Sequence, residues 1–381
     1  MEDRITMMEQ QRINRRKKQK RAEKMRAIFV SLLIIIILIL STLTFYYYYK
    51  FSLEKSEKEN AYFQAKEAKD AYDNLKQELK DGGYITIDAA NEMADDAVSL
   101  ATEDLKGQVR GYMESGDGTL TMLENLFTEN IVVPDIGRYR FFDVDSTLNL
   151  SELDYSKFSY PVKNEETSEY EGEVSYDDDI VTVHKGVDVS KFQGKVNWEK
   201  VKNDGIDFAY IRLGYRGYES GKIVLDDTYE DNINGCNEVG LDCGVYFFTE
   251  AKTEAEGREE AEFVLENLED YHTNLPVVID VEESANTKKS RTKNLTPEER
   301  TKIIIAFCEK IKEAGYTPMI YGNLKSFMLM TDIYQLEEYD RWFAYYHYPL
   351  RFPYRFKIWQ YTSSGNVDGI DTEADINLMF Y

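Results

Sequence analysis

Histidine and cysteine are scarce in this sequence, with only three of each in 381 residues. An odd number of cysteines does not indicate a disulfide framework, although Cys236 and Cys243 are near enough in the sequence to pair. Cys308 lies in an apolar helical pattern and is expected to be a buried free thiol. The histidines are scattered and show no metal-ligand spacing with the cysteines, so we expect no metal site and no cofactor.

Positive charge is also scarce, except in the first 26 residues. Lys and Arg number 46 against 70 Asp and Glu, which gives a formal net charge of −24. Residues 1–26 carry a formal net charge of +6, so the rest of the chain carries a net charge of −30. Because nucleic-acid affinity depends on neutralising phosphates, nucleic acid is not an expected partner. The apolar content of 43% suits globular structure, and the length favours two or three domains.

Charge is absent altogether from residues 27–49, whose centre, Leu32–Leu40, consists only of leucine and isoleucine. A helix over this run would be about 34 Å long, enough to cross a hydrocarbon core of about 30 Å. The tyrosines at 46–49 suit one membrane interface, and the basic run Arg15–Arg21 on the other side is typical of a cytoplasmic flank. A cleaved signal peptide is the alternative, but its apolar region would be shorter and a small-residue cleavage site would follow.

This pattern predicts a single-pass type II protein of the cell membrane. Residues 1–26 would form a cytoplasmic basic tail, residues 27–49 the transmembrane helix, and the C-terminal part would be extracellular. The cytoplasmic membrane is therefore one expected partner.

Residues 50–118 are expected to form a stalk of two antiparallel helices. The first has a heptad-like series of apolar residues, Ala61, Ala65, Ala68, Tyr72, Leu75 and Leu79, and ends at Asp81-Gly82-Gly83. The second has Ala90, Ala94, Ala97, Ala101 and Leu105 on one face. A parallel coiled coil between two chains is the alternative, with weak self-association through the stalk. Residues 119–184 would be a small mixed spacer region without catalytic residues.

Residues 185–381 alternate short apolar runs with amphipathic helical stretches. The runs that predict strands are 186–190, 207–213, 243–249, 276–282, 317–321, 341–345, 356–362 and 374–379. The helical stretches are 197–203, 226–239, 253–271 and 296–314. This alternation predicts an α/β fold, an irregular (β/α) barrel, preceded by a transmembrane helix and a mostly helical spacer.

Acidic residues occur at the ends of these strands, where such barrels place their active sites. In 276–282, alternation puts Val278, Asp280 and Glu282 on one face. Two carboxylates two strand residues apart have Cα atoms about 6.6 Å apart, and their carboxyl groups can approach roughly the separation of a retaining glycosidase. Like charge and burial would keep one acid protonated and leave the other ionised.

Two further acids belong to the first and last strands, which are neighbours in a closed barrel. Asp188 and Asp375 are therefore expected to border the same pocket. Each alone could instead be a cap or a structural hydrogen-bond acceptor. Aromatic residues at strand ends suit sugar stacking, although they could equally be core residues; the candidates are Tyr210, Tyr246, Tyr321, Trp359 and Tyr361.

The ordered set of motifs in this region resembles the family 25 glycoside hydrolases. The segments that carry the resemblance are Gly186–Gly194, Asn197-Trp198, Gly205–Ala209, Ile211-Arg212, Gly244-Val245-Tyr246, Asp280-Val281-Glu282, Pro318–Tyr321, Ile358–Gly365 and Asp375-Ile376-Asn377. The resemblance spans essentially all of 186–381 and none of 1–180. It implies an irregular barrel with five helices that cleaves, without a metal, the β-1,4 bond between N-acetylmuramic acid and N-acetylglucosamine in peptidoglycan.

The resemblance also implies roles for the acids. Glu282 matches the proton donor, and Asp280 matches the carboxylate beside it, either a nucleophile or a stabiliser of the attacking 2-acetamido group. Asp188 and Asp375 match the two further acids of the pocket. The segment 344–349 departs from the family, which more often has Trp after Gln here.

These observations predict a membrane-anchored peptidoglycan hydrolase, a lysozyme of the muramidase type. The alternative is a non-catalytic scaffold that uses the same barrel to bind peptidoglycan. Chitinase-type barrels also use Asp-x-Glu, but they usually have further Asp residues at the places that Pro276 and Val278 occupy here.

Overall fold

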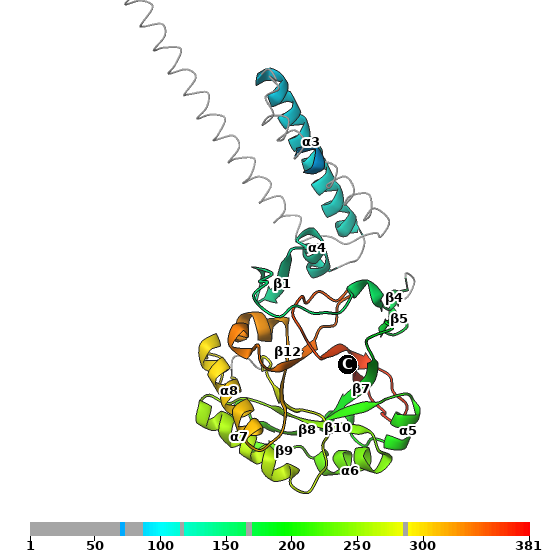
Figure 1. The fold of residues 1–381 in the computed structure, drawn as a ribbon, viewed down its shortest axis with the longest axis vertical. Helices are drawn as coiled ribbons and strands as arrows, with labels where there is room; N and C mark the ends of the chain where they lie inside the picture. The colour runs from blue at the N-terminus through cyan, green and yellow to red at the C-terminus, as the bar shows by residue number, and fades with distance from the viewer. Residues whose placement is uncertain (1–68, 73–86, 115–117, 165–169, 285–288) are drawn as a thin grey trace, which may run out of the picture. The chain divides into compact units, whose positions relative to one another are not determined.

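A computed structural model describes residues 69–72, 87–114, 118–164, 170–284 and 289–381 of the chain (Figure 1). The predicted cytoplasmic tail, 1–26, and the predicted transmembrane helix, 27–49, lie outside the described residues. Among the residues that are described, no helix has both the length and the apolar character needed to cross a membrane.

The chain divides into two compact units, residues 1–126 and 127–381. In the first unit, α3 covers Ile87–Glu114 and α4 covers Thr119–Leu126. Helix α3 includes the whole of the second helical pattern expected in the stalk. Most of the first pattern, 61–79, lies outside the described residues, so the helical hairpin and the self-association remain predictions.

The second unit contains a closed barrel of eight strands. They are β7 (Val183–Val189), β8 (Phe208–Arg216), β10 (Asp242–Phe248), β11 (Val277–Asp280), β12 (Pro318–Asn323), β13 (Asp340–Ala344), β14 (Ile358–Gly365) and β15 (Ala374–Phe380). Each strand pairs with the next in this order, and β15 pairs with β7 to close the ring. All pairs are parallel except those that β15 makes with β14 and β7.

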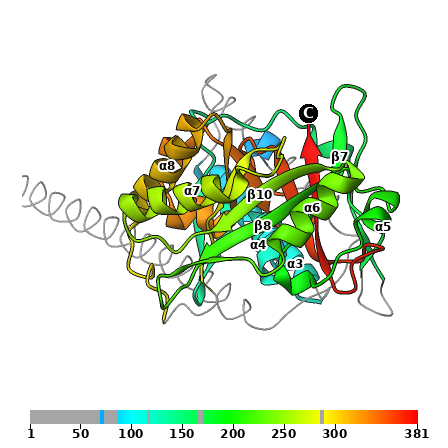
Figure 2. The same cartoon turned by 90° about the horizontal axis from the view of Figure 1, so that it is seen from below.

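All eight predicted runs are therefore strands, and the predicted α/β barrel is confirmed. The short strand β9 (Ile223–Leu225), which forms an antiparallel hairpin with β8, was not predicted. Helices α5 (Trp198–Asn203), α6 (Tyr229–Val239), α7 (Glu254–Leu268) and α8 (Pro297–Glu313) match the four predicted helical stretches. Figure 2 shows α6 and α7 beside β8 and β10, on the outside of the barrel.

Helix α8 begins and ends where its sequence directs. Thr296 and Glu299 form a reciprocal capping box, in which the Thr296 side chain accepts from the backbone N–H of Glu299 and the Glu299 carboxylate accepts from Thr296. Pro297 occupies the first turn, where its missing N–H costs nothing. Gly315 follows the helix with a φ of +87°, a backbone conformation that a side chain would disfavour.

Alternation along the strands separates two hydrophobic layers. In β11, Val277 and Ile279 pack into the main core with residues of α7 and α8. Val278 faces the other way, into the barrel interior, and packs with Phe208 and Met319. The interior is therefore filled with side chains, and polar residues on the inward face can be accommodated only at its ends.

The described residues between 127 and 184 pack against the barrel. Their elements are β1 (Asn130–Asp135), β2 (Arg138–Asp143), η1 (Tyr155–Lys157), β3 (Phe158–Ser159), β4 (Val162–Lys163), β5 (Tyr170–Glu171) and β6 (Ser175–Tyr176). The backbone N–H of Ser151 donates to Pro353, and the ring of Phe158 meets Trp359 edge-on, with 5.5 Å between centroids. These residues thus belong to the same compact unit as the barrel, which begins at Phe127, and the domain boundary near 185 stays a prediction.

Cys236 of α6 and Cys243 of β10 form a disulfide bond that the sequence left open. Both residues are buried, and the bond ties the helix to the strand that follows it. Cys308 is a buried free thiol within α8, as predicted.

Candidate active site

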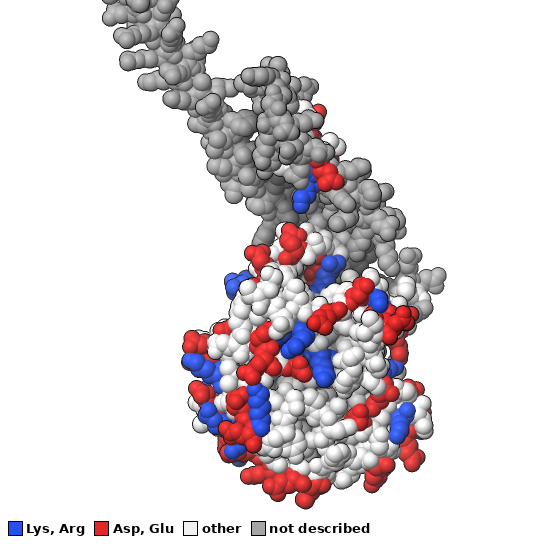
Figure 3. Space-filling view, in the orientation of Figure 1, with Lys and Arg blue, Asp and Glu red and all other residues white. Residues whose placement is uncertain are grey.

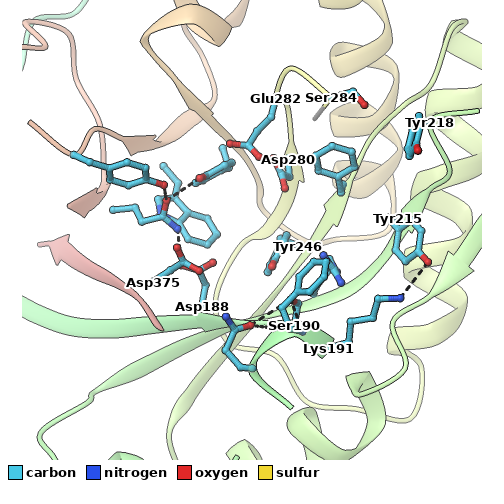
Figure 4. A pocket seen from close by; sticks show the side chains of 18 residues that line it. Asp188, Ser190, Lys191, Tyr215, Tyr218, Tyr246, Asp280, Glu282, Ser284 and Asp375 are labelled. Atoms are coloured by element: carbon cyan, nitrogen blue, oxygen red, sulfur yellow. Dashed lines mark hydrogen bonds between the residues drawn. The ribbon is translucent and has the colours of Figure 1, made fainter. Parts of the chain in front are cut away.

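A cavity of about 530 Å³ opens at the end of the barrel where the parallel strands finish (Figure 4). All four predicted acids line it: Asp188, Asp280, Glu282 and Asp375. Asp280 is the last residue of β11, and Glu282 follows it on the same side because strand residues alternate. The structure thus brings together residues from both ends of the predicted barrel sequence.

The antiparallel direction of β15 explains why Asp375 lies at this rim. A strand that runs against its neighbours begins where they end, and Asp375 is the second residue of β15. In the register of the sheet it lies directly opposite Asp188, near the end of β7. The last strand therefore adds a carboxyl group next to that of the first.

Burial controls the protonation of the Asp280–Glu282 pair. It raises the pKa of Glu282 to about 7, and the charge of Asp188 adds to this effect. Burial also raises the pKa of Asp280 well above its ordinary value, with the charges of Glu282 and Asp188 adding and that of Arg212 opposing. Asp280 Oδ1 is buried and has no hydrogen-bond partner among the described residues. That oxygen is therefore available to a ligand.

The other two acids differ in their hydrogen bonds. Burial and the charges of Asp188 and Glu282 raise the pKa of Asp375 to about 8. Burial raises the pKa of Asp188 only to about 6, because hydrogen bonds from Asn377 and Gln360 favour its ionised form. These carboxyl groups titrate as an interacting set, and at neutral pH the set holds protons that isolated carboxyl groups would have lost.

Gln360 and Asn377 were not predicted as site residues. Gln360 Nε2 donates to Asp188 Oδ2 at 2.7 Å, and Asn377 Nδ2 donates to the same oxygen at 2.9 Å. Both lie within motifs that carried the family resemblance. Strand parity could have identified Asn377, which is two residues after Asp375 and so faces the same side of β15.

Two of the five predicted sugar-stacking aromatics line the cavity, Tyr246 and Tyr321. The other three do not, and the prediction is wrong for them. Tyr210 is fully buried in the barrel interior, where its ring packs 4.6 Å from that of Trp342. Trp359 and Tyr361 have the opposite parity to Gln360 in β14 and pack outward, under residues 127–184 and the loop after β13.

Other aromatic residues complete the wall of the cavity. They are Phe192, Tyr215, Tyr218, Phe248, Trp342 and Tyr346. Phe192 is 72% exposed, and the guanidinium of Arg212 lies 5.0 Å from its ring centroid. Its short helix, η2 (Lys191–Gln193), is held by a capping box between Ser190 and Gln193. An apolar ring this exposed, yet fixed at the edge of a cavity, suits contact with a ligand.

The donor set offers little to a metal ion. Within the described ranges, no group of three or more His, Cys, Asp or Glu side chains is arranged to hold one. The arrangement suits acid–base chemistry instead, because buried carboxyl groups with raised pKa values surround a space open to a ligand.

Residues 187–370 match the family described as Glycosyl hydrolases family 25. The barrel is a family 25 glycoside hydrolase domain. Over 205 residues the chain is 27% identical to the uncharacterized protein YegX of Escherichia coli (strain K12), an alignment that covers 52% of this chain and 69% of YegX. Lysozyme M1 of Streptomyces globisporus is 26% identical over 205 residues, with 51% of this chain and 66% of that protein covered.

Among solved structures, the family 25 domain is similar to the modular autolysin LytC from Streptococcus pneumoniae, solved in complex with a synthetic peptidoglycan ligand. The TM-score is 0.48 at 24% identity, covering 66% of this chain and 57% of LytC. The present chain thus aligns with little more than half of that protein.

The segment in which the sequence departs from the family pattern reaches the cavity of this family 25 domain. Tyr346 lines the cavity, and its hydroxyl donates to Gln360 Oε1. The departure therefore adds a hydrogen bond to Gln360, which in turn donates to Asp188, rather than only changing the rim.

Proposed function

We propose that this family 25 domain hydrolyses the β-1,4 bond between N-acetylmuramic acid and N-acetylglucosamine in peptidoglycan. The observation that carries the proposal is the gathering of four carboxyl groups, two buried and two partly buried, in one cavity walled by aromatic side chains. Aromatic rings suit the faces of sugar rings, and carboxyl groups supply the acid and the stabilising charge that glycoside cleavage requires.

Glu282 is the proposed proton donor. With a pKa of about 7, a large fraction of its carboxyl groups is protonated at neutral pH, so it can give a proton to the leaving glycosidic oxygen. The same group, once ionised, can accept a proton from the water that completes hydrolysis.

Asp280 is proposed to act at the anomeric carbon, from which the leaving glycosidic oxygen departs. In its ionised form, Asp280 could bond to that carbon through its unpartnered Oδ1, or that oxygen could accept the N–H of a 2-acetamido group that attacks its own ring. Both routes invert the carbon twice, so both predict retention of the β configuration. Nuclear magnetic resonance of the first-formed reducing end would detect inversion if it occurred.

The charge of the domain bears on how it would recognise a glycan. On the face drawn in Figure 3, Asp and Glu are distributed over the barrel with Lys and Arg among them. The chain as a whole carries a net charge of −24. Attraction by net charge would therefore not favour an anionic wall polymer, and we infer that binding relies on stacking and hydrogen bonds in the cavity.

We further propose that the chain is anchored in the cytoplasmic membrane with the family 25 domain outside. The uncharged run 27–49 and the basic residues before it support this orientation. The Cys236–Cys243 disulfide supports it independently, because disulfide bonds persist mainly in oxidising compartments. Protease added to wall-stripped cells should remove the barrel and leave the N-terminus protected; a protected barrel would contradict the orientation.

Digestion of purified peptidoglycan by the purified full-length chain tests the activity. New reducing ends should be N-acetylmuramic acid, and Glu282→Gln should abolish their release. Reducing ends of N-acetylglucosamine would assign the cleavage to the other bond of the strand. Binding without release would favour the non-catalytic scaffold. A protein that neither binds nor cleaves would overturn both functions.

A further inference from the structure

Asp188 differs from the other cavity acids in how its carboxylate is held. It is buried, yet its Oδ2 accepts hydrogen bonds from two side-chain amides, Gln360 at 2.7 Å and Asn377 at 2.9 Å. An amide N–H stabilises an ionised carboxylate more than a neutral carboxyl group. By contrast, one oxygen of Asp280 has no partner among the described residues.

The two amides are themselves locked in the orientation that favours a negative charge. The indole N–H of Trp342 donates to Asn377 Oδ1 at 2.7 Å. Indole can only donate, so Asn377 must direct its oxygen to Trp342 and its N–H groups to Asp188. Reversing this amide would cost the indole its partner in a buried site.

Gln360 is oriented from the other side by two phenols, which hold it less strictly than an indole because a phenol hydroxyl can also accept. Its Oε1 accepts from Tyr321 at 2.7 Å and from Tyr346 at 2.5 Å, which leaves Nε2 to face Asp188. A flipped amide would place oxygen against Asp188, an arrangement that is favourable only if Asp188 is protonated. The orientation of Gln360 and the ionisation of Asp188 are therefore coupled.

We propose that Asp188 carries the negative charge of the acid cluster in the free protein, and that Gln360 and Asn377 are positioning residues that hold it there. Trp342, Tyr321 and Tyr346 act through those amides. The raised pKa values are consistent with this order, since that of Asp188, about 6, lies below those of Glu282, about 7, and Asp375, about 8, and burial also raises the pKa of Asp280 well above its ordinary value. This proposal deepens the muramidase function and rests on it for its catalytic meaning.

The charge has a consequence for the proton donor. An ionised Asp188 raises the pKa of Glu282, which keeps the proton of Glu282 in place at neutral pH. The ionised Asp188 raises the pKa of Asp375 in the same way. The network thus separates Asp188, which ionises early, from Glu282 and Asp375, which ionise at higher pH.

Other groups also face Asp188 from the strands around it. They are Asp280 and Glu282 at the end of β11, Asp375 in β15, Tyr246 in β10, Tyr321 in β12 and Tyr346 after β13. The carboxyl groups contribute like charge when ionised, whereas the phenols, whose pKa values are raised by burial, stay neutral. Arg212 of β8 opposes them through its effect on Asp280. For Asp188 to ionise first, the stabilisation of its carboxylate by the Gln360 and Asn377 amides must exceed the repulsion from the neighbouring carboxyl groups.

Infrared titration of the purified full-length chain tests the proposal without any substrate. The difference between each protein and its Asp188→Asn counterpart isolates the ionisation of Asp188. In the unmodified chain the titration midpoint of Asp188 should lie near pH 6. The midpoints of Asp280 and Asp375, obtained in the same way from the variants Asp280→Asn and Asp375→Asn, should be higher. Removal of one donor in Asn377→Leu should raise the midpoint of Asp188 by about one to two pH units, since a hydrogen bond to a charged group is worth about that much.

Two conservative variants keep the test decisive if Asn377→Leu does not fold. Trp342→Phe should raise the midpoint by freeing the Asn377 amide. Tyr346→Phe should raise it less, because Tyr321 still donates to Gln360. Tyr334→Phe, which loses a similar phenol bond to Asp145, is the matched control and should leave it unchanged.

The proposal is overturned if Asp280 or Asp375 ionises before Asp188, or if neither Trp342→Phe nor Tyr346→Phe moves the midpoint in folded protein. The pH profile of peptidoglycan cleavage adds a second readout, because Asp188→Asn should move its alkaline limb to lower pH. Absence of cleavage would refute the muramidase function and leave the titration result standing.

Discussion

Two groups of buried or partly buried carboxylates in the barrel differ in what faces them. Asp226 lies 2.6 Å from the guanidinium of Arg212, and Glu260 lies 2.6 Å from that of Arg216. The cavity acids Asp188, Asp280, Glu282 and Asp375 form no ion pair with Lys or Arg in the part of the chain that the structure describes. Asp188 and Asp280 are buried like Asp226 and Glu260, while Glu282 and Asp375 are partly buried, so the counter-ion is what distinguishes the two groups.

This difference shows that burial alone does not identify the candidate site. Glu260 also has a pKa raised to about 7, chiefly by burial, although it accepts from both Arg216 and Thr249. It joins helix α7 to strand β8 and is enclosed on all sides. An unpaired acid that opens onto a cavity has no such structural gain, so its cost is explained only by function.

Replacing an unpaired cavity acid should therefore reduce activity but not stability. Glu282→Gln retains the volume of the side chain but cannot donate the acidic proton, so release of muramic-acid reducing ends should fall by at least about 10²–10⁴-fold. Its melting temperature should be unchanged or higher, because repulsion within the acid cluster is relieved.

Glu283→Gln is the matched control for this variant. Glu283 is the next residue, is partly exposed, and pairs with Lys325 rather than facing the other acids. It should retain near wild-type activity. A Glu282→Gln protein that melts normally and still releases reducing ends at the wild-type rate would exclude Glu282 as the proton donor.

Breaking a paired carboxylate should have the opposite outcome. Arg216→Leu leaves Glu260 buried without its cation, which typically costs about 3–5 kcal/mol of unfolding free energy. Chemical denaturation followed by tryptophan fluorescence would measure this loss, because all three tryptophans belong to the barrel. The protein that remains folded should cleave peptidoglycan at a nearly normal rate. A large loss of specific activity without a loss of stability would place Arg216 in the catalytic machinery.

The pH dependence of stability should separate the two groups further. Asp375 has a folded pKa of about 8, above its unfolded value of about 3.9. The folded protein holds this proton more tightly, so its contribution to stability is complete below about pH 4 and is lost as the pH rises through 8. The stability of Asp375→Asn relative to wild type should therefore increase between pH 4 and pH 8.

Asp226→Asn provides the comparison, because it removes the partner of Arg212 and should be less stable than wild type at pH 8. Denaturant titrations at several pH values would test both variants. If Asp375→Asn gained no stability relative to wild type as the pH rose, the unfavourable ionisation of Asp375 inside the cavity would be refuted.

Strand periodicity and motif order predicted much of this structure from the sequence. Eight apolar runs predicted eight strands, and the parity of Asp280 and Glu282 predicted their common face. Chain order alone predicted that Asp188 and Asp375 would meet, since the first and last strands of a closed barrel are neighbours. The strands and the common face depend on local rules that hold along a single strand, and the meeting of Asp188 and Asp375 depends only on closure of the barrel.

Features that depend on contacts between distant segments were missed. Trp359 and Tyr361 were interpreted as sugar contacts because no local rule showed that Phe158 and its neighbours would cover that face of β14. Gln360, between them, faces the cavity instead. The pairing of Cys236 with Cys243 likewise depends on how α6 packs on β10.

The smallest expected effect concerns binding rather than chemistry. Phe192 is exposed at the cavity edge, with Arg212 5.0 Å from its ring centroid and Ser190 and Gln193 fixing its short helix. We expect this ring to stack on a sugar beside the cleaved bond. Covering about 40 Å² of apolar surface is worth about 1 kcal/mol, so Phe192→Ala should raise KM for polymeric glycan about fivefold.

The kcat of this variant should be unchanged, because the ring lies outside the group of acids, and Phe192→Trp should retain a low KM. Phe141→Ala is the control, since Phe141 is 44% exposed on β2 and does not line the cavity. Steady-state kinetics on glycan strands of defined length would separate the two constants. A fall in kcat with unchanged KM would mean that Phe192 acts through Arg212 on the acids, and would remove the distinction between the binding rim and the catalytic group.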